Sequence, residues 1–282
     1  MHMQNTIAVH AVSLSLLLQA SIAAAVTTVP GSSNPNLAGR ADGYACCGGD
    51  SVPQSSPAAV TETDFSPCDV LNFSATGKVN FAGVPVTGNN PDGEGAFSLL
   101  NYNDGIAPAL NVRVDALVGV FLGPDSPTGS PTPTPISFQS GLGFAWLAPG
   151  IGQMFFVGDG LTSDSNAGLF NGEQQSFIVP AGATRLFLGT VDGEGWYNNS
   201  GSFSVDVSIS DKPFDECGDP AKPAGITASD ALVALRTAVG TGSCLVCTCD
   251  VDASGGIVAS DALAVLRHAV GLNVQLVCQP CC

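Results

Sequence analysis

Hydrophobic and polar positions alternate along residues 179–210, and this stretch predicts two strands joined by a polar loop. A period of two residues is that of a strand with one buried face, and it is present both in residues 185–190 and after the loop. The loop itself, residues 192–199, contains two carboxylates, two amides and two aromatic side chains. The apolar positions of the second strand are Phe203, Val205, Val207 and Ile209.

Short apolar runs alternate with turn residues through the rest of residues 69–210, without a helical period. This spacing is typical of an antiparallel β-sandwich. Thr-Pro repeats predict a loop over residues 123–135, and a second polar loop is expected over residues 158–172. The apolar runs occupy residues 118–122, 136–138, 144–147, 154–157 and 176–179.

The period changes after Cys217, where residues 226–240 are almost duplicated by residues 257–271. Leu and Val recur at helical spacing in both copies, which predicts two loop-helix units. Ser is expected to cap the start of each helix and Gly to end it. These positions are Ser229 and Gly240 in the first copy, and Ser260 and Gly271 in the second.

An acidic loop of twelve residues, 250–261, leads into the second predicted helix. Its spacing matches a calcium-binding loop, in which side chains and one backbone carbonyl supply hard oxygen ligands. The alternative is an acidic turn that holds no metal. The expected ligands are Asp250, Asp252 and Ser254 at positions 1, 3 and 5, the Gly256 carbonyl at position 7, and Asp261 at position 12.

The loop of residues 192–199 is a second candidate calcium site. Its glycines allow a sharp turn that aims carbonyls inward, which suits a cation with several oxygen ligands. The alternative is a polar turn, because Asn, Asp and Gly favour turns for backbone reasons alone. Trp196 and Tyr197 are adjacent aromatic residues, and exposed aromatics beside a cation often hold a sugar.

Residues 188–207 resemble the calcium and sugar loop of the PA-IL type of galactose-binding bacterial lectin, above all in the run Asn198-Asn-Ser-Gly-Ser-Phe-Ser-Val205. Residues 75–81 and 116–123 resemble earlier strands of that lectin, so the resemblance covers residues 68–210. It implies a small β-sandwich that holds one calcium ion between two loops. In that family a galactose-like sugar supplies two hydroxyls as calcium ligands.

Carried over to this chain, the resemblance implies Asp192, Asn198 and Asn199 as side-chain ligands. Backbone carbonyls near Gly195 or Trp196, and at Phe81, would complete the site. The chain departs from the family at Phe81, where the family has a tyrosine, and the loop is one residue shorter. The family's sugar-contacting His and Gln have no match here. The expected carbohydrate contacts are Asp192, Trp196, Tyr197, Asn198 and Asp92.

The duplicated loop-helix pattern resembles type I dockerins, which bind two calcium ions and dock secreted proteins onto cohesin domains. The first copy departs from the family, because Ala221 and Pro223 occupy ligand positions between Asp219 and Asp230. The resemblance therefore implies one calcium ion in this module and a cohesin-bearing partner.

An apolar run near the N-terminus ends in three alanines, so residues 1–25 are expected to be a signal peptide of a secreted protein. The alternative is an uncleaved membrane anchor. No later segment is long and apolar enough to predict a membrane span. Residues 26–67, rich in Ser, Pro and Gly without periodicity, predict a flexible segment.

The ten cysteines gather on either side of the β region. Export favours disulfides, and Cys46 and Cys47 are expected to pair with Cys68 or with C-terminal cysteines rather than with each other. Zinc is the alternative, because two C-x-x-C pairs follow at a plausible separation. They are Cys244 with Cys247 and Cys278 with Cys281.

A net charge of −16, from 24 acidic and 8 basic residues, disfavours binding to nucleic acid or anionic lipid. The chain has three histidines, His2, His10 and His268, and none lies in the β region to act as a base for Ser-His or Cys-His chemistry. An enzyme is therefore not expected. A carboxylate pair such as Glu173 and Asp192 leaves a glycoside hydrolase as the alternative.

The sequence thus predicts a mostly β protein: a signal peptide over 1–25, a flexible segment over 26–67, a lectin-like antiparallel β-sandwich over 68–212 and a Cys-rich α-helical dockerin-like module over 213–282. The expected function is calcium-dependent carbohydrate binding outside the cell, in polysaccharide binding or breakdown. Alternatives are a structural protein stabilised by calcium and a polysaccharide-degrading enzyme.

Overall fold

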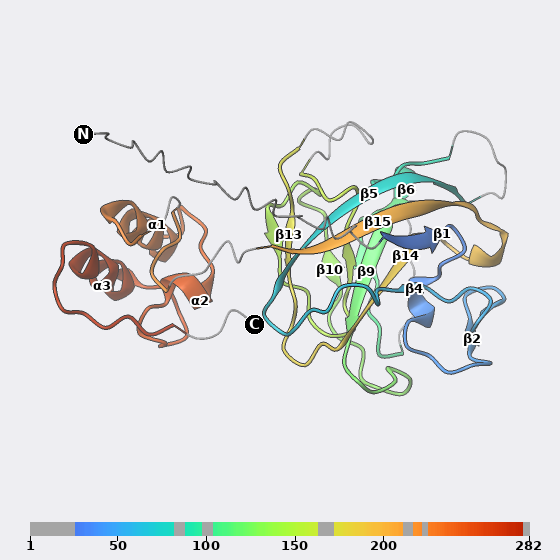
Figure 1. Cartoon of the computed structure of the whole chain (residues 1–282), viewed down its shortest axis with the longest axis horizontal. Helices are drawn as coiled ribbons and strands as arrows, with labels where there is room; N and C mark the ends of the chain where they lie inside the picture. The colour runs from blue at the N-terminus through green and yellow to red at the C-terminus, as the bar shows by residue number, and fades with distance from the viewer. Residues whose placement is uncertain are drawn as a thin grey trace, which may run out of the picture.

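The computed structural model describes residues 26–81, 88–97, 104–162, 172–210, 217–221 and 225–278. Strands dominate it, and the three helices form a group of their own at the C-terminal end (Figure 1). The prediction of a mostly β protein with a small helical part is confirmed. The predicted signal peptide lies outside the described residues. No helix in the described ranges is long and apolar enough to cross a bilayer.

The first of two main sheets has five strands in the order β1-β15-β5-β13-β11. Neighbouring strands are antiparallel, except that β11 runs parallel to β13. The longest ladder joins β5 to β15 over eleven residue pairs, so these two strands form the backbone of the sheet. The strands are β1 (Val26–Pro30), β15 (Ser200–Ser210), β5 (Val70–Asn80), β13 (Ser176–Ile178) and β11 (Trp146–Leu147).

The second main sheet is antiparallel and has the order β12-β9-β14-β4. Three further strand pairs are short, and one of them, β7 with β10, is parallel. The four strands of the sheet are β12 (Met154–Phe156), β9 (Leu117–Leu122), β14 (Arg185–Thr190) and β4 (Ala58–Ala59). The short pairs are β2 (Ala45–Cys46) with β3 (Asp50–Ser51), β6 (Glu94–Phe97) with β8 (Arg113–Val114), and β7 (Ala109–Leu110) with β10 (Ile136–Ser137).

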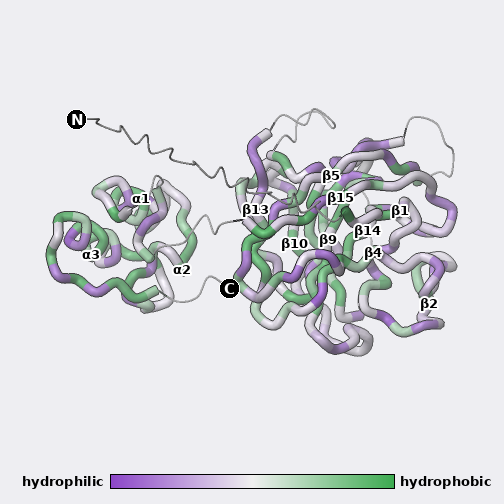
Figure 2. The backbone as a smooth tube through the Cα atoms, viewed as in Figure 1, coloured by the Kyte–Doolittle hydropathy of each residue, from purple (hydrophilic) through white to green (hydrophobic). Residues whose placement is uncertain are grey.

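Aromatic side chains join the two sheets into one hydrophobic core. Phe155 of β12 lies 5.5 Å from Phe177 of β13, measured between ring centroids, and Phe177 meets Phe73 of β5 edge to face at 5.0 Å. All three rings are buried, and Figure 2 shows hydrophobic residues concentrated along the central strands. The sheets therefore face each other as in a sandwich.

The two strands on either side of the polar loop, β14 and β15, lie where the sequence predicts them. They belong to different sheets, so the loop between them crosses from one sheet to the other. Three of the four predicted inward positions of β15 are buried, but Ile209 is 47% exposed. The crossing places residues 192–199 at one end of the sandwich.

The prediction of a flexible segment over residues 26–67 is wrong. Strand β1 pairs with β15 over five residues, and Val29 is fully buried. A short 3-10 helix, η1 (Pro35–Leu37), is also buried, and Ser33 accepts a hydrogen bond from the N–H of Thr190 in β14. This segment is part of the sandwich. Its polar residues are buried through distant hydrogen bonds, so it shows no hydrophobic period.

The two predicted helices are present as α1 (Ala228–Ala238) and α3 (Ala259–Ala269), with a short helix, α2 (Val246–Cys249), between them. Gly240 and Gly271 follow the two ends with positive φ, as a C-terminal glycine does. The predicted caps Ser229 and Ser260 are wrong, because each helix begins before its serine. The N-caps are Thr227 and Val258, whose N–H groups donate to Asp230 and Asp261.

Disulfides correct two expectations about the cysteines. Cys46 is bonded to its neighbour Cys47, although the sequence argued against bonding between adjacent cysteines. The zinc alternative is wrong for the described cysteines, because Cys244, Cys247 and Cys278 are all in disulfides. Two of these bonds are Cys217–Cys278 and Cys244–Cys249, and both fasten the helical module.

Candidate calcium sites

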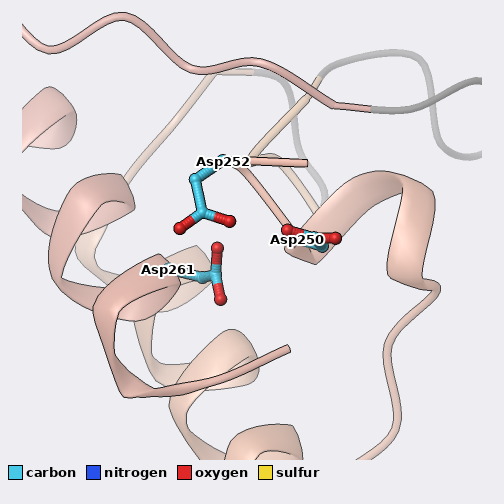
Figure 3. A group of neighbouring side chains, drawn as sticks. All are labelled: Asp250, Asp252 and Asp261. Atoms are coloured by element: carbon cyan, nitrogen blue, oxygen red, sulfur yellow. The ribbon is translucent and has the colours of Figure 1, made fainter. Parts of the chain in front are cut away.

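Three carboxylates meet in the acidic loop before α3. Oxygen atoms of Asp250, Asp252 and Asp261 all lie within 4.8 Å of one another. Figure 3 shows the three side chains turned toward a common point from the end of α2, the following turn and the start of α3. Asp250 and Asp261 are buried, whereas Asp252 is exposed. Like charges at this distance repel one another, so the arrangement favours a cation.

Backbone N–H groups hold the loop in shape around these carboxylates. Asp250 accepts from the N–H of Ser254 at 3.0 Å and of Gly255 at 2.6 Å. Burial acts to raise the pKa of Asp250, but these hydrogen bonds outweigh it and the pKa is lowered. The carboxyl group therefore stays ionised, which is the state that binds a metal.

The remaining two expected ligands lie in the same loop. The hydroxyl of Ser254 is 3.4 Å from Oδ1 of Asp250 and 3.4 Å from the carbonyl oxygen of Gly256. Asp261 is fixed from both sides, because its two oxygens accept from the N–H groups of Val251 and Val258. The structure thus brings all five sequence-predicted ligands of this loop together.

Backbone N–H groups hold the two acidic residues of the first repeat much as they hold those of the second. Asp219 accepts from the N–H of Gly225 at 2.9 Å, and Asp230 accepts from the N–H groups of Ala221 and Thr227. Ala221 offers no side-chain ligand, and the Cys217–Cys278 disulfide ties the start of this loop to the C-terminal segment. Backbone hydrogen bonds and a disulfide therefore hold the first loop.

At the end of the sandwich, Asp192 and Asn199 are in contact across the loop that joins β14 to β15. The side-chain amide of Asn199 donates to Oδ2 of Asp192 at 2.9 Å. Asp192 is 6% exposed, and Oδ1 of Asn199 is buried without a hydrogen-bond partner. These are two of the three side chains that the sequence predicts as ligands. Asn198, the third, is exposed on the same loop.

A third buried group beside Asp192, Asp115, was missed at the level of sequence. The β9–β14 ladder ends with Thr190 opposite Leu117, and beyond it the N–H of Asp115 donates to the carbonyl of Val191. Asp115 therefore lies next to Asp192 at the end of the ladder. One signal was available: Asp115 is the single acidic residue within the otherwise apolar run 114–122.

The electrostatics of Asp115 are those of a buried anion near a second one. Its Oδ2 accepts from Asn89 at 2.8 Å and from the N–H of Phe81 at 3.3 Å, and its Oδ1 has no hydrogen-bond partner. Burial, with a smaller contribution from the charge of Asp192, raises the pKa of Asp115 to about 6. Burial likewise raises the pKa of Asp192. Two neighbouring buried carboxylates are stabilised by protonation of one of them or by a nearby cation.

Of the two aromatic residues expected to contact sugar, only Tyr197 is exposed. Its side chain is 53% exposed, whereas Trp196 is fully buried and its Nε1 donates to the carbonyl of Thr190 at 2.8 Å. The prediction for Trp196 is therefore corrected, because a satisfied indole is stable inside the sandwich. Phe81, 47% exposed, lies beside Asp115 and offers a second aromatic surface.

Asp92, also expected to contact sugar, is buried. It is 3% exposed, and its Oδ1 accepts from the N–H of Asp159 at 3.0 Å. Asp159 is equally buried, with no hydrogen-bond partner for its Oδ2. Burial, followed by the charge of Asp92, raises the pKa of Asp159 to about 6. The prediction for Asp92 is corrected: it belongs to a buried acidic pair.

The Asp159→Asn variant is expected to lose part of the pH dependence of stability. A carboxyl whose pKa is raised in the folded state contributes stability below its ordinary pKa, and this is lost as the pH rises through about 6. With chelator present, the wild-type melting temperature should therefore be higher at pH 5 than at pH 7.5. The variant should narrow this difference by a few degrees, and the exposed Asp125→Asn control should not. Equal differences in all three proteins would contradict the assignment.

Neither a protein-family model nor a curated protein sequence matches this chain.

Proposed function

We propose that this chain is a secreted, calcium-dependent carbohydrate-binding protein, in which a calcium ion at the end of the sandwich presents free coordination positions to sugar hydroxyls. The observation that carries the proposal is that Asp192 accepts a hydrogen bond from Asn199 and has a second buried carboxylate, Asp115, next to it at the end of the β9–β14 ladder. Two of their oxygens, Oδ1 of Asp115 and Oδ1 of Asn199, are buried without a hydrogen-bond partner. Buried polar atoms in native proteins are nearly always paired, and a cation would satisfy these oxygens.

The donor set suits calcium. Calcium takes six to eight oxygen ligands and accepts carboxylates, side-chain amides and backbone carbonyls. Asp192 and Asn199 supply such oxygens, and Asn198 and the Phe81 carbonyl would extend the set as the lectin resemblance implies. A sugar that supplies two hydroxyls would complete the coordination.

Two exposed aromatic rings near this site support a carbohydrate ligand. Tyr197 belongs to the same loop as Asp192, and Phe81 donates its N–H to Asp115. Both rings are about half exposed. The apolar face of a sugar ring would pack against such a surface while its hydroxyls face the ion, and a galactose-like sugar is the first candidate.

The C-terminal module is proposed to bind one calcium ion and to dock the sandwich onto a partner. Four leucines at equivalent positions of the two repeats are exposed, and they line a groove of about 350 Å³ between α1 and α3. Calcium at the loop of residues 250–261 would fix α3 against α1. A cohesin-bearing protein is the partner implied by the dockerin resemblance. The leucines are Leu232, Leu235, Leu263 and Leu266.

Binding of the full-length protein to a glycan array, with calcium and with chelator, tests the carbohydrate part of the proposal. Binding to galactose-containing or other glycans that requires calcium, and that the Asp192→Ala variant loses, is the expected result. A folded protein that binds no glycan under either condition would contradict it and favour a structural role for calcium. Release of reducing sugar from a polysaccharide would instead identify an enzyme.

A further inference from the structure

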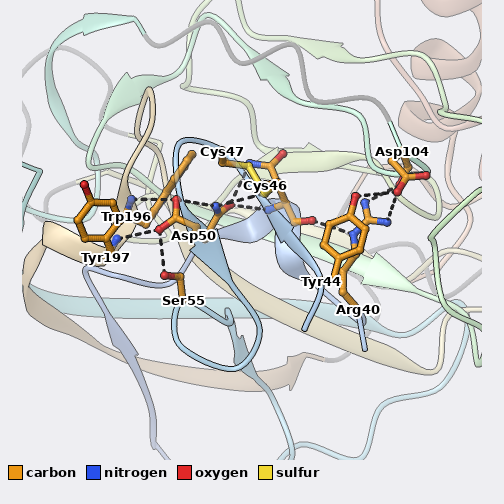
Figure 4. The surroundings of a disulfide bond; sticks show 11 residues. Arg40, Tyr44, Cys46, Cys47, Asp50, Ser55, Asp104, Trp196 and Tyr197 are labelled. Carbon is orange, nitrogen blue, oxygen red and sulfur yellow. Dashed lines mark hydrogen bonds and ion pairs between the residues drawn. A yellow bond between two sulfur atoms is a disulfide. The ribbon is translucent and has the colours of Figure 1, made fainter. Parts of the chain in front are cut away.

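The segment of residues 26–67 contacts the proposed calcium loop of residues 192–199, called the calcium loop below, through one buried carboxylate, Asp50. It is fully buried and lies at the start of β3, immediately after the turn of residues 46–49, which contains the Cys46–Cys47 disulfide. Figure 4 shows it between the disulfide and the calcium loop. Its Oδ1 accepts from the N–H of Tyr197 at 2.8 Å, and its Oδ2 accepts from the N–H of Trp196 at 3.1 Å.

Two further donors complete the surroundings of Asp50. The hydroxyl of Ser55 donates to Oδ1 at 2.9 Å, and the side-chain amide of Asn34 donates to Oδ2 at 3.3 Å. Both oxygens are therefore already engaged by protein groups that come from three separate parts of the chain. Asp50 is for this reason a positioning residue and not a metal ligand.

No side chain of the loop itself takes the role of Asp50. The loop contains a short 3-10 helix, η2 (Trp196–Asn198), whose N-cap is Gly195 and which has no side-chain cap of its own. The first N–H groups of such a turn need an acceptor, and an anion is the best one. Asp50 supplies it from 146 residues away in sequence and so fixes the turn that separates Asp192 from Asn199.

The turn of residues 46–49 also contacts the loop directly. The carbonyl of Cys47 accepts from the N–H of Gly195 at 3.1 Å. A Cβ atom on Gly48 would lie 3.1 Å from Cβ of Glu194, so the turn is packed closely against the loop at this point. Gly48 also has a φ of +77°, which glycine adopts without strain. The turn thus holds Gly195, while Asp50 holds the two residues that follow.

We propose that Asp50 and the Cys46–Cys47 turn form a positioning unit that sets the calcium affinity of the loop of residues 192–199. The unit holds the loop with Asp192 and Asn199 in contact before the ion arrives, which reduces the ordering that binding requires. The negative charge of Asp50 also lies close enough to Asp192 to add to the attraction for a cation. This inference rests on the proposed calcium site in the sandwich.

Calcium titration of the full-length chain tests the unit. The C-terminal site is first removed by Asp250→Ala together with Asp252→Ala, so that calcium binding reports the sandwich alone. In that background, Asp50→Asn is expected to weaken calcium binding by about 10-fold or more, the effect of losing a group that orients metal ligands. Cys46→Ala with Cys47→Ala, which removes the disulfide that constrains the backbone of these two residues, should weaken it several-fold. Asp42→Asn, an exposed charge in the same segment, is the matched control and should leave the affinity unchanged.

A residue that only stabilises the fold would lower the melting temperature without changing the affinity of the folded protein. Affinities are therefore compared well below the melting temperature of each variant in chelator. Unchanged affinity in folded Asp50→Asn overturns the inference. If that variant does not fold, the Ser55→Ala variant tests the inference instead. It removes one hydrogen-bond donor to Asp50 and is expected to weaken calcium binding a few-fold, and unchanged calcium affinity in it would overturn the inference. A background protein that binds no calcium would overturn the proposed sandwich site, and the inference with it.

Discussion

Asp250→Ala is expected to abolish calcium binding at the C-terminal loop and to remove the stabilisation that calcium gives the helical module. Asp250 offers a carboxylate to the ion and also accepts the N–H groups of Ser254 and Gly255, so both the ligand and the shape of the loop are lost. An ion that binds only the folded module stabilises it by about 2.7 kcal/mol at a concentration 100 times its Kd. Calcium titration and thermal melting with and without chelator measure the loss.

Asp219→Ala is the matched control, because Asp219 holds the equivalent first position of the other repeat. If only the second loop binds calcium, this variant keeps the wild-type stoichiometry. Loss of one bound ion in Asp219→Ala would show that the first loop binds calcium too. An Asp250→Ala protein with unchanged stoichiometry and unchanged calcium-dependent melting would contradict the site.

Compared with the wild type, the Asp115→Asn variant is expected to be equally or more stable without calcium and less stable with calcium. In chelator at pH 7.5 the variant removes one of two neighbouring buried charges, and its melting temperature should be equal to or higher than that of the wild type. With calcium, the wild type gains stabilisation that the variant lacks, so the wild type should melt several degrees higher. Asp192→Ala should lose the calcium-dependent gain altogether.

The comparison is made by thermal melting of the sandwich transition in the Asp250→Ala background, in which calcium acts on one site. Asp125→Asn, an exposed carboxylate, is the control for a general effect of charge. An Asp115→Asn protein with the full calcium-dependent gain would show that Asp115 is not part of the cation site. A variant that is less stable than the wild type by the same amount in both conditions would assign Asp115 a purely structural role.

Patterns between near neighbours in sequence predicted much of the fold. The period of two residues located β14 and β15, and the spacing of the acidic loop located five groups that the structure brings together. These features depend on residues within one or two turns of chain. Local spacing therefore contains most of the information that defines them.

Long-range contacts explain what the sequence did not reveal. Asp50 contacts Trp196 and Tyr197 across 146 and 147 residues, and Asp115 approaches Asp192 only because β9 pairs with β14. The prediction that Trp196 contacts sugar was wrong for the same reason, because the adjacency of Trp196 and Tyr197 in the sequence does not indicate which ring is buried. Buried polar residues follow no hydrophobic period, so residues 26–67 resembled a linker although β1 completes a sheet.

The most direct test of the central claim is the reciprocal effect of sugar and calcium on each other's binding. The calcium affinity of the Asp250→Ala protein is measured with and without a saturating concentration of the glycan that binds best on the array. If the sugar coordinates the ion in the sandwich, the glycan must raise calcium affinity, and calcium must raise glycan affinity by the same factor. Equal calcium affinity with and without glycan, together with glycan binding that persists in chelator, would contradict the claim that sugar binds through calcium.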